Sequence, residues 1–172
     1  MDGDSPEVLD DVLQSCLQVV FCGTAAGKRS AFLRHPYAGP GNKFWATIHQ
    51  IRLTDTQLSP SDYRKLLNFG LGLTDIAKRA SGADSVLSSG DFDVQTLQKK
   101  LKKFSPRILA FNGKKAASVF YQRPTGKLQY GLQPDVIGET SVWVLPSTSG
   151  SARRYWKIAP WQQLADFNLT KD

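Results

Sequence analysis

Cysteine and histidine are scarce in this sequence, with two residues of each type among 172. Cys16 and Cys22 have no histidine nearby in the sequence to complete a set of metal ligands, and both lie in or beside an apolar run. We therefore predict neither a disulfide framework nor a zinc site. Both cysteines are expected to be reduced and to pack like small hydrophobic side chains.

Long apolar runs are also missing. No stretch approaches the ~20 apolar residues that a membrane span requires, and the start, Met1-Asp2-Gly3-Asp4, lacks the basic and apolar regions of a signal peptide. We expect a protein of the cytoplasm without membrane contact. The hydrophobic content of 41% suits a single compact domain over residues 1–172, and we expect a monomer.

Acidic residues are outnumbered, with 15 Asp and Glu against 22 Lys and Arg, which gives a formal net charge of +7. Five of the acids lie in the first eleven residues, which hold no basic residue. From position 12 onward, 22 basic side chains therefore stand against 10 acidic ones, a net charge of +12. Such an excess is typical of a nucleic-acid-binding surface, although a soluble basic protein without such a partner could carry the same charge.

The pattern of apolar residues predicts alternating helices and strands. Helical spacing over residues 7–17 predicts an amphipathic helix within an N-terminal lead-in, residues 1–17. Continuous apolar runs predict strands buried on both faces, at 19–22, 107–112 and 142–145. Further helices are expected at 44–51, 59–69, 91–104, 114–121 and 156–167. This order predicts an α/β fold, a three-layer α/β/α sandwich around a mainly parallel central sheet, with ligand sites at the carboxyl ends of the strands.

Three loops follow the predicted strands, at residues 23–29, 112–115 and 147–154, and should meet at one edge of the sheet. They combine small residues, which expose backbone N–H groups, with cations suited to phosphates. The cations are Lys28, Arg29, Lys114, Lys115, Arg153 and Arg154. The first loop fails as a P-loop, because three residues rather than four separate Gly23 from Gly27 and no Ser or Thr follows Lys28. Nucleotide hydrolysis is therefore not expected.

Five segments form an ordered set of motifs. They are Val20-Phe21-Cys22-Gly23-Thr24-Ala25-Ala26-Gly27, Tyr37-Ala38-Gly39-Pro40-Gly41-Asn42-Lys43-Phe44-Trp45, Gly72-Leu73-Thr74-Asp75, Pro106-Arg107-Ile108-Leu109-Ala110-Phe111-Asn112-Gly113-Lys114 and Val144-Leu145-Pro146-Ser147-Thr148-Ser149-Gly150-Ser151-Ala152-Arg153. In this order they resemble the mismatch-specific uracil-DNA glycosylase and thymine-DNA glycosylase family of the uracil-DNA glycosylase superfamily, in its bacterial form. The resemblance covers residues 17–165, nearly the whole chain.

The resemblance implies a monofunctional DNA-repair glycosylase. Such an enzyme flips uracil out of a G:U mismatch in DNA and hydrolyses its bond to deoxyribose, as a step of base excision repair. Other damaged pyrimidines are expected as further substrates. Water is then the second substrate, DNA is the partner, and no metal or cofactor is expected. Two alternatives stay open: an inactive relative that binds lesions without cleaving, and a glycosylase for another base, such as hypoxanthine, xanthine or thymine opposite guanine.

The resemblance also implies roles for individual residues. The expected base-binding residues are Gly23, Thr24, Ala25, Tyr37, Asn112 and Ser147. Tyr37 would stack on the flipped base, although an aromatic side chain at this position could also serve core packing alone. The expected DNA-binding residues are Lys28, Arg29, Lys114, Gly150, Ser151, Arg153 and Arg154. In the family, the loop that begins at Ser147 enters the duplex where the base has left.

Three positions depart from the family pattern. Ala25 stands where the family has an Asn that positions the catalytic water, and a methyl group cannot hydrogen-bond water. Ser151 replaces the bulky wedge residue of the bacterial enzymes, and Ser147 replaces an Asn. We therefore expect either that activity is lost or that another group has taken over.

Four acids on the long connection over residues 74–90 and the helix after it could replace the missing Asn: Asp75, Asp84, Asp91 and Asp93. An ionised Asp can orient and deprotonate water and can stabilise a cationic sugar. Asp75 matches a family position near the base, where a carboxylate would repel the carbonyl oxygens of uracil. Asp91 is explained by the dipole of the following helix. Asp93 is explained less well in that way, so it is the first catalytic candidate and Asp75 the second.

Overall fold

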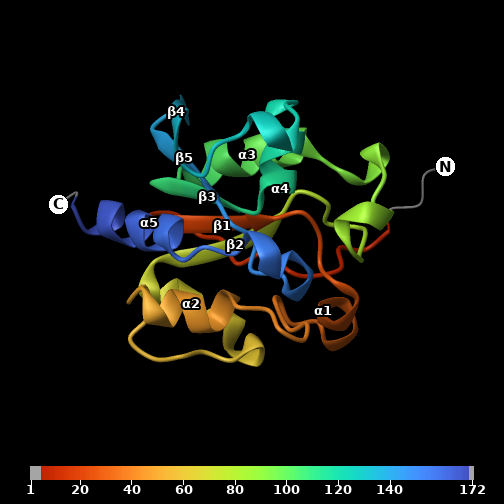
Figure 1. The fold of residues 1–172 in the computed structure, drawn as a ribbon, viewed down its shortest axis with the longest axis horizontal. Coiled ribbons are helices and arrows are strands. Elements are labelled where there is room, and N and C mark those ends of the chain that lie inside the picture. The colour runs from red at the N-terminus through yellow and green to blue at the C-terminus, as the bar shows by residue number, and fades with distance from the viewer. Residues whose placement is uncertain (1–4, 171–172) are drawn as a thin grey trace.

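The computed structural model describes residues 5–170 and shows a five-stranded sheet between two layers of helices (Figure 1). The strands are β1 (Val19–Gly23), β2 (Leu71–Asp75), β3 (Ile108–Asn112), β4 (Gly131–Ile137) and β5 (Thr140–Leu145), in the order β2-β1-β3-β5-β4. All neighbouring strands are parallel except β4 and β5, which form an antiparallel pair. The predicted α/β sandwich around a mainly parallel sheet is thereby confirmed.

The central strands are buried on both faces, as their continuous apolar sequences predicted. Every residue of β1 and β3 is buried. Because successive side chains of a strand point to opposite faces, β1 contributes Val19 and Phe21 to one core and Val20 and Cys22 to the other. Cys22 therefore packs like a small hydrophobe, as expected, whereas Cys16 is exposed.

Helices cover both faces of the sheet. One core contains residues of α2 (Phe44–Gln50), of the 3-10 helix η1 (Pro60–Phe69) and of α5 (Ala159–Leu169), and α1 (Lys28–Leu33) lies next to α2 in Figure 1. The other core contains residues of α3 (Val94–Phe104) and α4 (Lys114–Tyr121). Four 3-10 segments complete the fold: η2 (Asp84–Val86), η3 (Ser89–Asp91), η4 (Thr125–Lys127) and η5 (Gly150–Tyr155). No helix in residues 5–170 is long and apolar enough to cross a membrane.

The segment between η1 and the sheet shows how local signals set the boundaries. Ser59 caps η1 in a capping box with Asp62, and Pro60 occupies its first position, as predicted. Gly70 ends the helix in a left-handed conformation at φ 70°. The chain then enters β2, a strand that we had not predicted, because its glycine at position 72 suggested the end of a helix rather than a strand.

The predicted helix over residues 7–17 is wrong. In this segment Val12 instead forms an antiparallel bridge with Leu73, in which each residue donates a backbone N–H to the other's carbonyl at 2.9 Å. Leu9, Val12 and Leu17 are buried, so the apolar residues do pack on the domain. They do so along the outer edge of β2, whose free backbone groups favour an extended partner over a helix. Residues 1–4 of the predicted lead-in lie outside the described residues.

Asp11 anchors this N-terminal segment through three side chains. Its carboxylate accepts a hydrogen bond from Thr74 Oγ1 at 2.7 Å and forms ion pairs with Lys78, at 2.9 Å, and Lys100. Lys78 is only 8% exposed and also donates to the carbonyl of Leu9 at 2.6 Å. Burial by itself raises the pKa of Asp11, but the two lysines and Thr74 together hold that pKa below its ordinary value.

Replacing Asp11 with Asn should lower the free energy of unfolding by about 2–4 kcal/mol at pH 7, because it leaves the Lys78 charge buried without its closest carboxylate. Since the pKa of Asp11 is lower in the folded state, its contribution is present above the unfolded value and is lost as the pH falls through the folded one. Denaturation of both proteins at pH 7 and pH 3 tests this. Asp10→Asn is the control, because Asp10 pairs with Arg64 in solvent; equal effects of the two changes would contradict the prediction.

Candidate functional site

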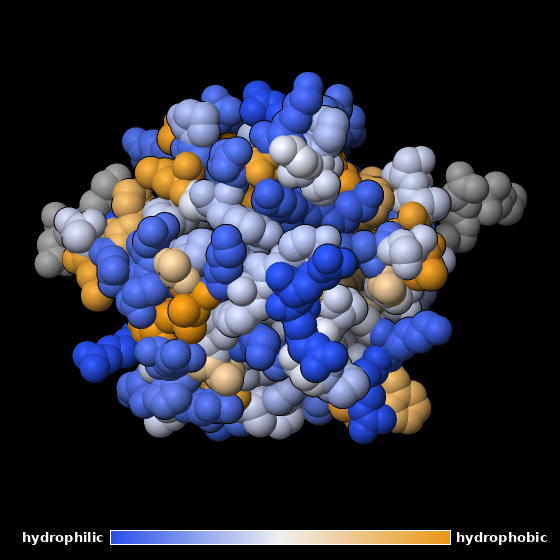
Figure 2. Space-filling model, viewed as in Figure 1, coloured by the Kyte–Doolittle hydropathy of each residue, from blue (hydrophilic) through white to orange (hydrophobic). Residues whose placement is uncertain are grey.

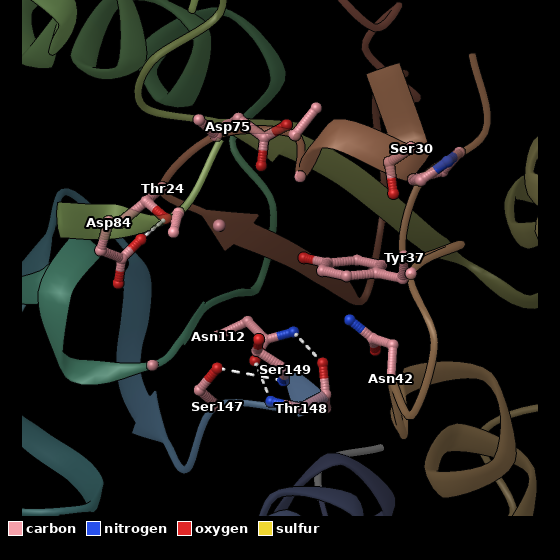
Figure 3. A pocket seen from close by; sticks show the side chains of 18 of the residues that line it. Thr24, Ser30, Tyr37, Asn42, Asp75, Asp84, Asn112, Ser147, Thr148 and Ser149 are labelled. Atoms are coloured by element: carbon pink, nitrogen blue, oxygen red, sulfur yellow. Dashed lines mark hydrogen bonds between the residues drawn. The ribbon is translucent and has the colours of Figure 1, made fainter. Parts of the chain in front are cut away.

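A cavity of about 790 Å³ opens at the carboxyl ends of the parallel strands. The loops after β1, β3 and β5, which we expected to meet, all line it, together with residues 36–42 and the connection after β2. Figure 3 shows their side chains converging from opposite sides, with Asp75 at one side of Tyr37 and Asn112 at the other. The cavity therefore lies where an open parallel sheet places its ligands.

Most of the predicted site residues line this cavity. The base-binding candidates all do so, namely Gly23, Thr24, Ala25, Tyr37, Asn112 and Ser147. Of the DNA-binding candidates, the lining includes Lys28, Arg29, Lys114, Gly150 and Ser151. Arg153 and Arg154 are exposed on η5 and do not line it.

The loop after β1 is fixed to the connection that follows β2. The carbonyls of Gly23 and Thr24 accept hydrogen bonds from the N–H groups of Ile76 and Ala77, at 3.0 and 2.7 Å, and Gly82 donates to the Ala26 carbonyl at 2.8 Å. These bonds continue the pairing of β1 with β2, in which Gly23 lies opposite Asp75. The backbone of the loop is thus held in place before any ligand binds.

Position 23 favours glycine, because a side chain there would crowd two residues of the cavity. A Cβ atom at this position would lie 2.7 Å from Asp75 Oδ1 and 3.3 Å from the Tyr37 hydroxyl. The carboxylate and the phenol therefore approach the backbone of β1 at the same point.

Tyr37 has a strained backbone, and its side chain lies between the apolar core and the polar cavity. Its φ of 54° is left-handed, which is uncommon for a bulky residue and is often found at functional sites. Its ring stacks on the buried ring of Phe44, with centroids 4.2 Å apart. Burial, followed by the Asp75 charge, raises the pKa of Tyr37, while a hydrogen bond with the Asn112 side chain lowers it less. Tyr37 therefore both packs against the core and lines the cavity.

Asn112 acts first as a support for the loop after β5. Its Nδ2 donates to Thr148 Oγ1 at 2.9 Å, and its Oδ1 accepts from the Thr148 N–H at 3.0 Å. Both residues are buried. Within the loop, Ser147 Oγ accepts from the N–H of Ser149 at 3.2 Å. The side chains of Asn112 and Ser147 are thus oriented by bonds within the protein.

The four candidate acids divide into two groups. Asp75 and Asp84 line the cavity, whereas Asp91 and Asp93 do not. The exposed Asp93 caps α3, because its carboxylate accepts from the Thr96 N–H at 2.9 Å and from Thr96 Oγ1 at 2.6 Å. Those bonds lower the pKa of Asp93. The reason for ranking it first, that a helix end explained it poorly, is therefore wrong.

Asp75 is the carboxyl group of the cavity whose charge is most affected by its surroundings. Burial raises its pKa to about 6, and Asp11 adds to this effect, while Lys78, Lys100 and the Gly23 backbone oppose it. Its side chain points into the cavity in Figure 3. A carboxyl group with such a pKa can exchange a proton near neutral pH.

The structure gives specific contacts to two cavity residues that the sequence did not single out. Asp84, on the connection after β2, accepts a hydrogen bond from Thr24 Oγ1 at 2.6 Å and ties that connection to the first loop. Asn42 accepts the Phe44 N–H at 3.0 Å and turns its amide nitrogen toward the cavity (Figure 3). Asp84 was one acid among four, and only the long-range pairing distinguishes it. The signal for Asn42 was its place in a Pro/Gly-rich segment after Tyr37.

Replacing Asp75 with Asn should stabilise the protein at alkaline pH. Because the pKa of Asp75 is higher folded than unfolded, the wild type loses stability as the pH rises through about 6, whereas Asn carries no charge to bury. We expect a gain of about 2 kcal/mol in the free energy of unfolding at pH 8 that disappears by pH 4. Denaturant titrations at both pH values measure it.

Asp84→Asn is the matched control for this measurement, because it removes an exposed acid from the same cavity. It should show no comparable gain at pH 8. A variant of Asp75 that is less stable than the wild type at pH 8 would refute the assignment of a half-buried carboxylate whose charge costs stability.

Comparisons with known proteins agree with this architecture. The solution NMR structure of a candidate uracil DNA glycosylase from Methanosarcina acetivorans matches with a TM-score of 0.66 over 96% of this chain and 98% of the other, at 23% sequence identity. This likeness bears on the fold. The sequence model of the uracil DNA glycosylase superfamily matches residues 11–168, a span that includes all residues lining the cavity except Leu9 and Asp10. The chain therefore belongs to the uracil DNA glycosylase superfamily.

Proposed function

We propose that the protein is a monofunctional DNA glycosylase that flips uracil out of DNA into the cavity and hydrolyses its N-glycosidic bond. The observation that carries this proposal is the combination, in one cavity, of the Tyr37 ring with the half-buried carboxyl group of Asp75. An aromatic face and backbone hydrogen-bonding groups are the general means of holding a flipped base. A carboxylate nearby can activate the water that replaces it.

We assign the activation of water to Asp75 rather than to Asp93. Ala25 cannot hydrogen-bond water, and of the four candidate acids only Asp75 and Asp84 reach the cavity. With a pKa of about 6, Asp75 is ionised at neutral pH yet basic enough to accept a proton from water. The same negative charge would stabilise the positive charge that develops on the sugar as the base leaves.

The hydrolysis then needs only this carboxylate and water. The bond between C1′ of the sugar and the base nitrogen breaks with its electron pair going to the base, and water adds to C1′ while Asp75 takes its proton. That proton then passes to the base anion, directly or through solvent, and Asp75 is ionised again. Lys78, which also lines the cavity, has its Nζ bonded to Asp11 and to the Leu9 carbonyl, so this scheme gives it no part as a nucleophile. The products are an abasic site and the free base.

Within the superfamily, the ordered motifs favour the mismatch-specific and thymine-DNA glycosylase branch. The departures at Ala25, Ser147 and Ser151 concern the water, the base contacts and the wedge, respectively. Uracil opposite guanine is therefore the substrate with which to begin, and thymine, hypoxanthine and xanthine in the same position are the alternatives to compare. Release of none of these bases would favour a lesion-binding relative without activity.

Asp75→Asn should reduce uracil release by ~100-fold or more under single-turnover conditions, the scale for loss of a general base. The wild-type rate should rise about tenfold per pH unit below pH 6 and level off above it, because Asp75 must be ionised, and the variant should lose this dependence. Alkaline cleavage of the abasic product reports the rate. Because the variant is expected to be more stable at pH 8, unfolding cannot account for a loss.

Asp84→Asn separates the two acids of the cavity. We expect a smaller loss from this change, since Asp84 is exposed and already accepts the Thr24 hydroxyl. If Asp84→Asn abolishes release while Asp75→Asn retains a rate within threefold of the wild type, the roles are reversed.

Tyr37→Ala should lower uracil release much more than it lowers affinity for undamaged DNA. Stacking is worth ~1–3 kcal/mol per base and acts on this base only once it is flipped. Tyr37→Phe keeps the ring and the contact with Phe44, so it should keep most of the activity. Equal rates for the Ala and Phe variants would show that Tyr37 is not the stacking surface.

A further inference from the structure

Several pairs of a cation and an aromatic ring lie at or near the cavity, among them the following three. The Arg29 guanidinium lies 5.8 Å from the ring centre of Phe32, Lys114 Nζ lies 4.5 Å from that of Tyr130, and the Arg154 guanidinium lies 5.4 Å from that of Tyr155. Arg29 and Lys114 line the cavity themselves. Two of these rings extend into solvent: Phe32 is 79% and Tyr155 60% exposed.

The pairs stand on both sides of the cavity. Phe32 follows Arg29 by three residues on α1, so the two share one face of that helix. Burial and then the charge of Tyr155 raise the pKa of Tyr130, so the two phenols lie within electrostatic range of each other. In Figure 1, α1 lies on the α2 side of the sheet, whereas α4, which carries Lys114, lies on the opposite side.

The surface between these pairs is polar and basic. Figure 2, viewed as in Figure 1, shows strongly hydrophilic side chains at the centre and lower right, where η5 and α1 lie, with groups of intermediate hydropathy between them. η5 supplies Arg153 and Arg154, and α1 supplies Lys28 and Arg29. Aromatic rings interleaved with cations are the usual surface for a single nucleic-acid strand, because each base offers a face for stacking and each nucleotide a phosphate.

At the position of the family's bulky wedge residue, the loop after β5 carries only the short side chain of Ser151. Ser151, exposed at the start of η5, ends in a hydroxyl within 2.9 Å of Ser149 Oγ, and Ala152 follows it. Flipping a nucleotide from a duplex leaves an unstacked gap and an unpaired partner base, and both cost free energy. An unpaired strand has neither cost, so it requires no wedge.

We propose that the substrate is uracil in single-stranded DNA, and that Phe32 and Tyr155 stack on bases on either side of the flipped nucleotide. This inference rests on the proposed glycosylase function and specifies its substrate class. The cations beside each ring bind the phosphates, and the rings replace the stacking that the flipped base and its neighbours lose. Affinity then comes from contacts that any base sequence can make.

The test compares uracil release from a single-stranded oligonucleotide with release from the same strand paired opposite guanine. We expect the wild type to release uracil about tenfold faster from the single strand, since the cost of unpairing is absent. Phe32→Ala and Tyr155→Ala should each weaken binding of the single strand, measured by fluorescence anisotropy, by about tenfold. Both residues are exposed, so circular dichroism should show an unchanged fold.

Two further variants sharpen the result. Phe32→Trp keeps a stacking surface and should bind the single strand at least as tightly as the wild type. Leu169→Ala removes another exposed hydrophobic side chain, 76% exposed, at the far end of the molecule on α5, and should change nothing. If Phe32→Ala and Leu169→Ala behave alike, Phe32 does not stack on DNA.

Failure of the inference and failure of the proposed function give different results. A wild-type enzyme that releases uracil faster from the duplex, with binding of the single strand unaffected by Phe32→Ala and Tyr155→Ala, overturns the inference and retains the glycosylase. A wild type that releases no base from either substrate overturns the proposed function. In that case weaker single-strand binding by both variants would still support the stacking surface.

Discussion

The pairing of β1 with β2 is the interaction on which the cavity depends. It places Gly23 opposite Asp75 and continues beyond the strands, where the loop carbonyls of Gly23 and Thr24 accept backbone hydrogen bonds from Ile76 and Ala77. Because Gly23 has no side chain, a carboxylate and a phenol can both approach the backbone there. A shift of this register by one residue would turn Asp75 to the other face of the sheet.

Ionising Asp75 connects stability with chemistry in this fold. A carboxyl group that takes up a proton near neutral pH must be partly shielded from water, and this desolvation of its charged form lowers the stability of the folded protein. Lys78 and Lys100 moderate this cost, whereas the charge of Asp11, with which both form ion pairs, adds to it. The N-terminal segment, which carries Asp11, thus affects the electrostatics of a cavity that it only borders.

The sequence predicted the parts of the fold that are set by local pattern. The buried strands, the cap at Ser59 and the three strand-end loops follow from apolar runs, from turn residues and from the geometry of parallel sheets. The helix over residues 7–17 was wrong because its apolar spacing suits a helix, while the unpaired edge of β2, which favours an extended partner, is a tertiary feature. Asp93 was misjudged for the opposite reason, because its place as the cap of α3 depends on a local signal, Thr96 three residues later, which the missing Asn at position 25 outweighed. Asp84 could not be singled out, because its bond to Thr24 spans 60 residues.

Val12 occupies both backbone bonding positions of Leu73 on the outer side of β2. At the opposite border of the sheet, β4 contains Pro134 and an irregular register between Leu132 and Val136. An uninterrupted row of free N–H and C=O groups on an edge strand is a template for pairing with another chain. Here the row on β2 is interrupted by Val12, and the row on β4 is interrupted by a proline and an irregular register. Copies of the protein at high local concentration would therefore lack the regular borders through which β-sheets join into aggregates.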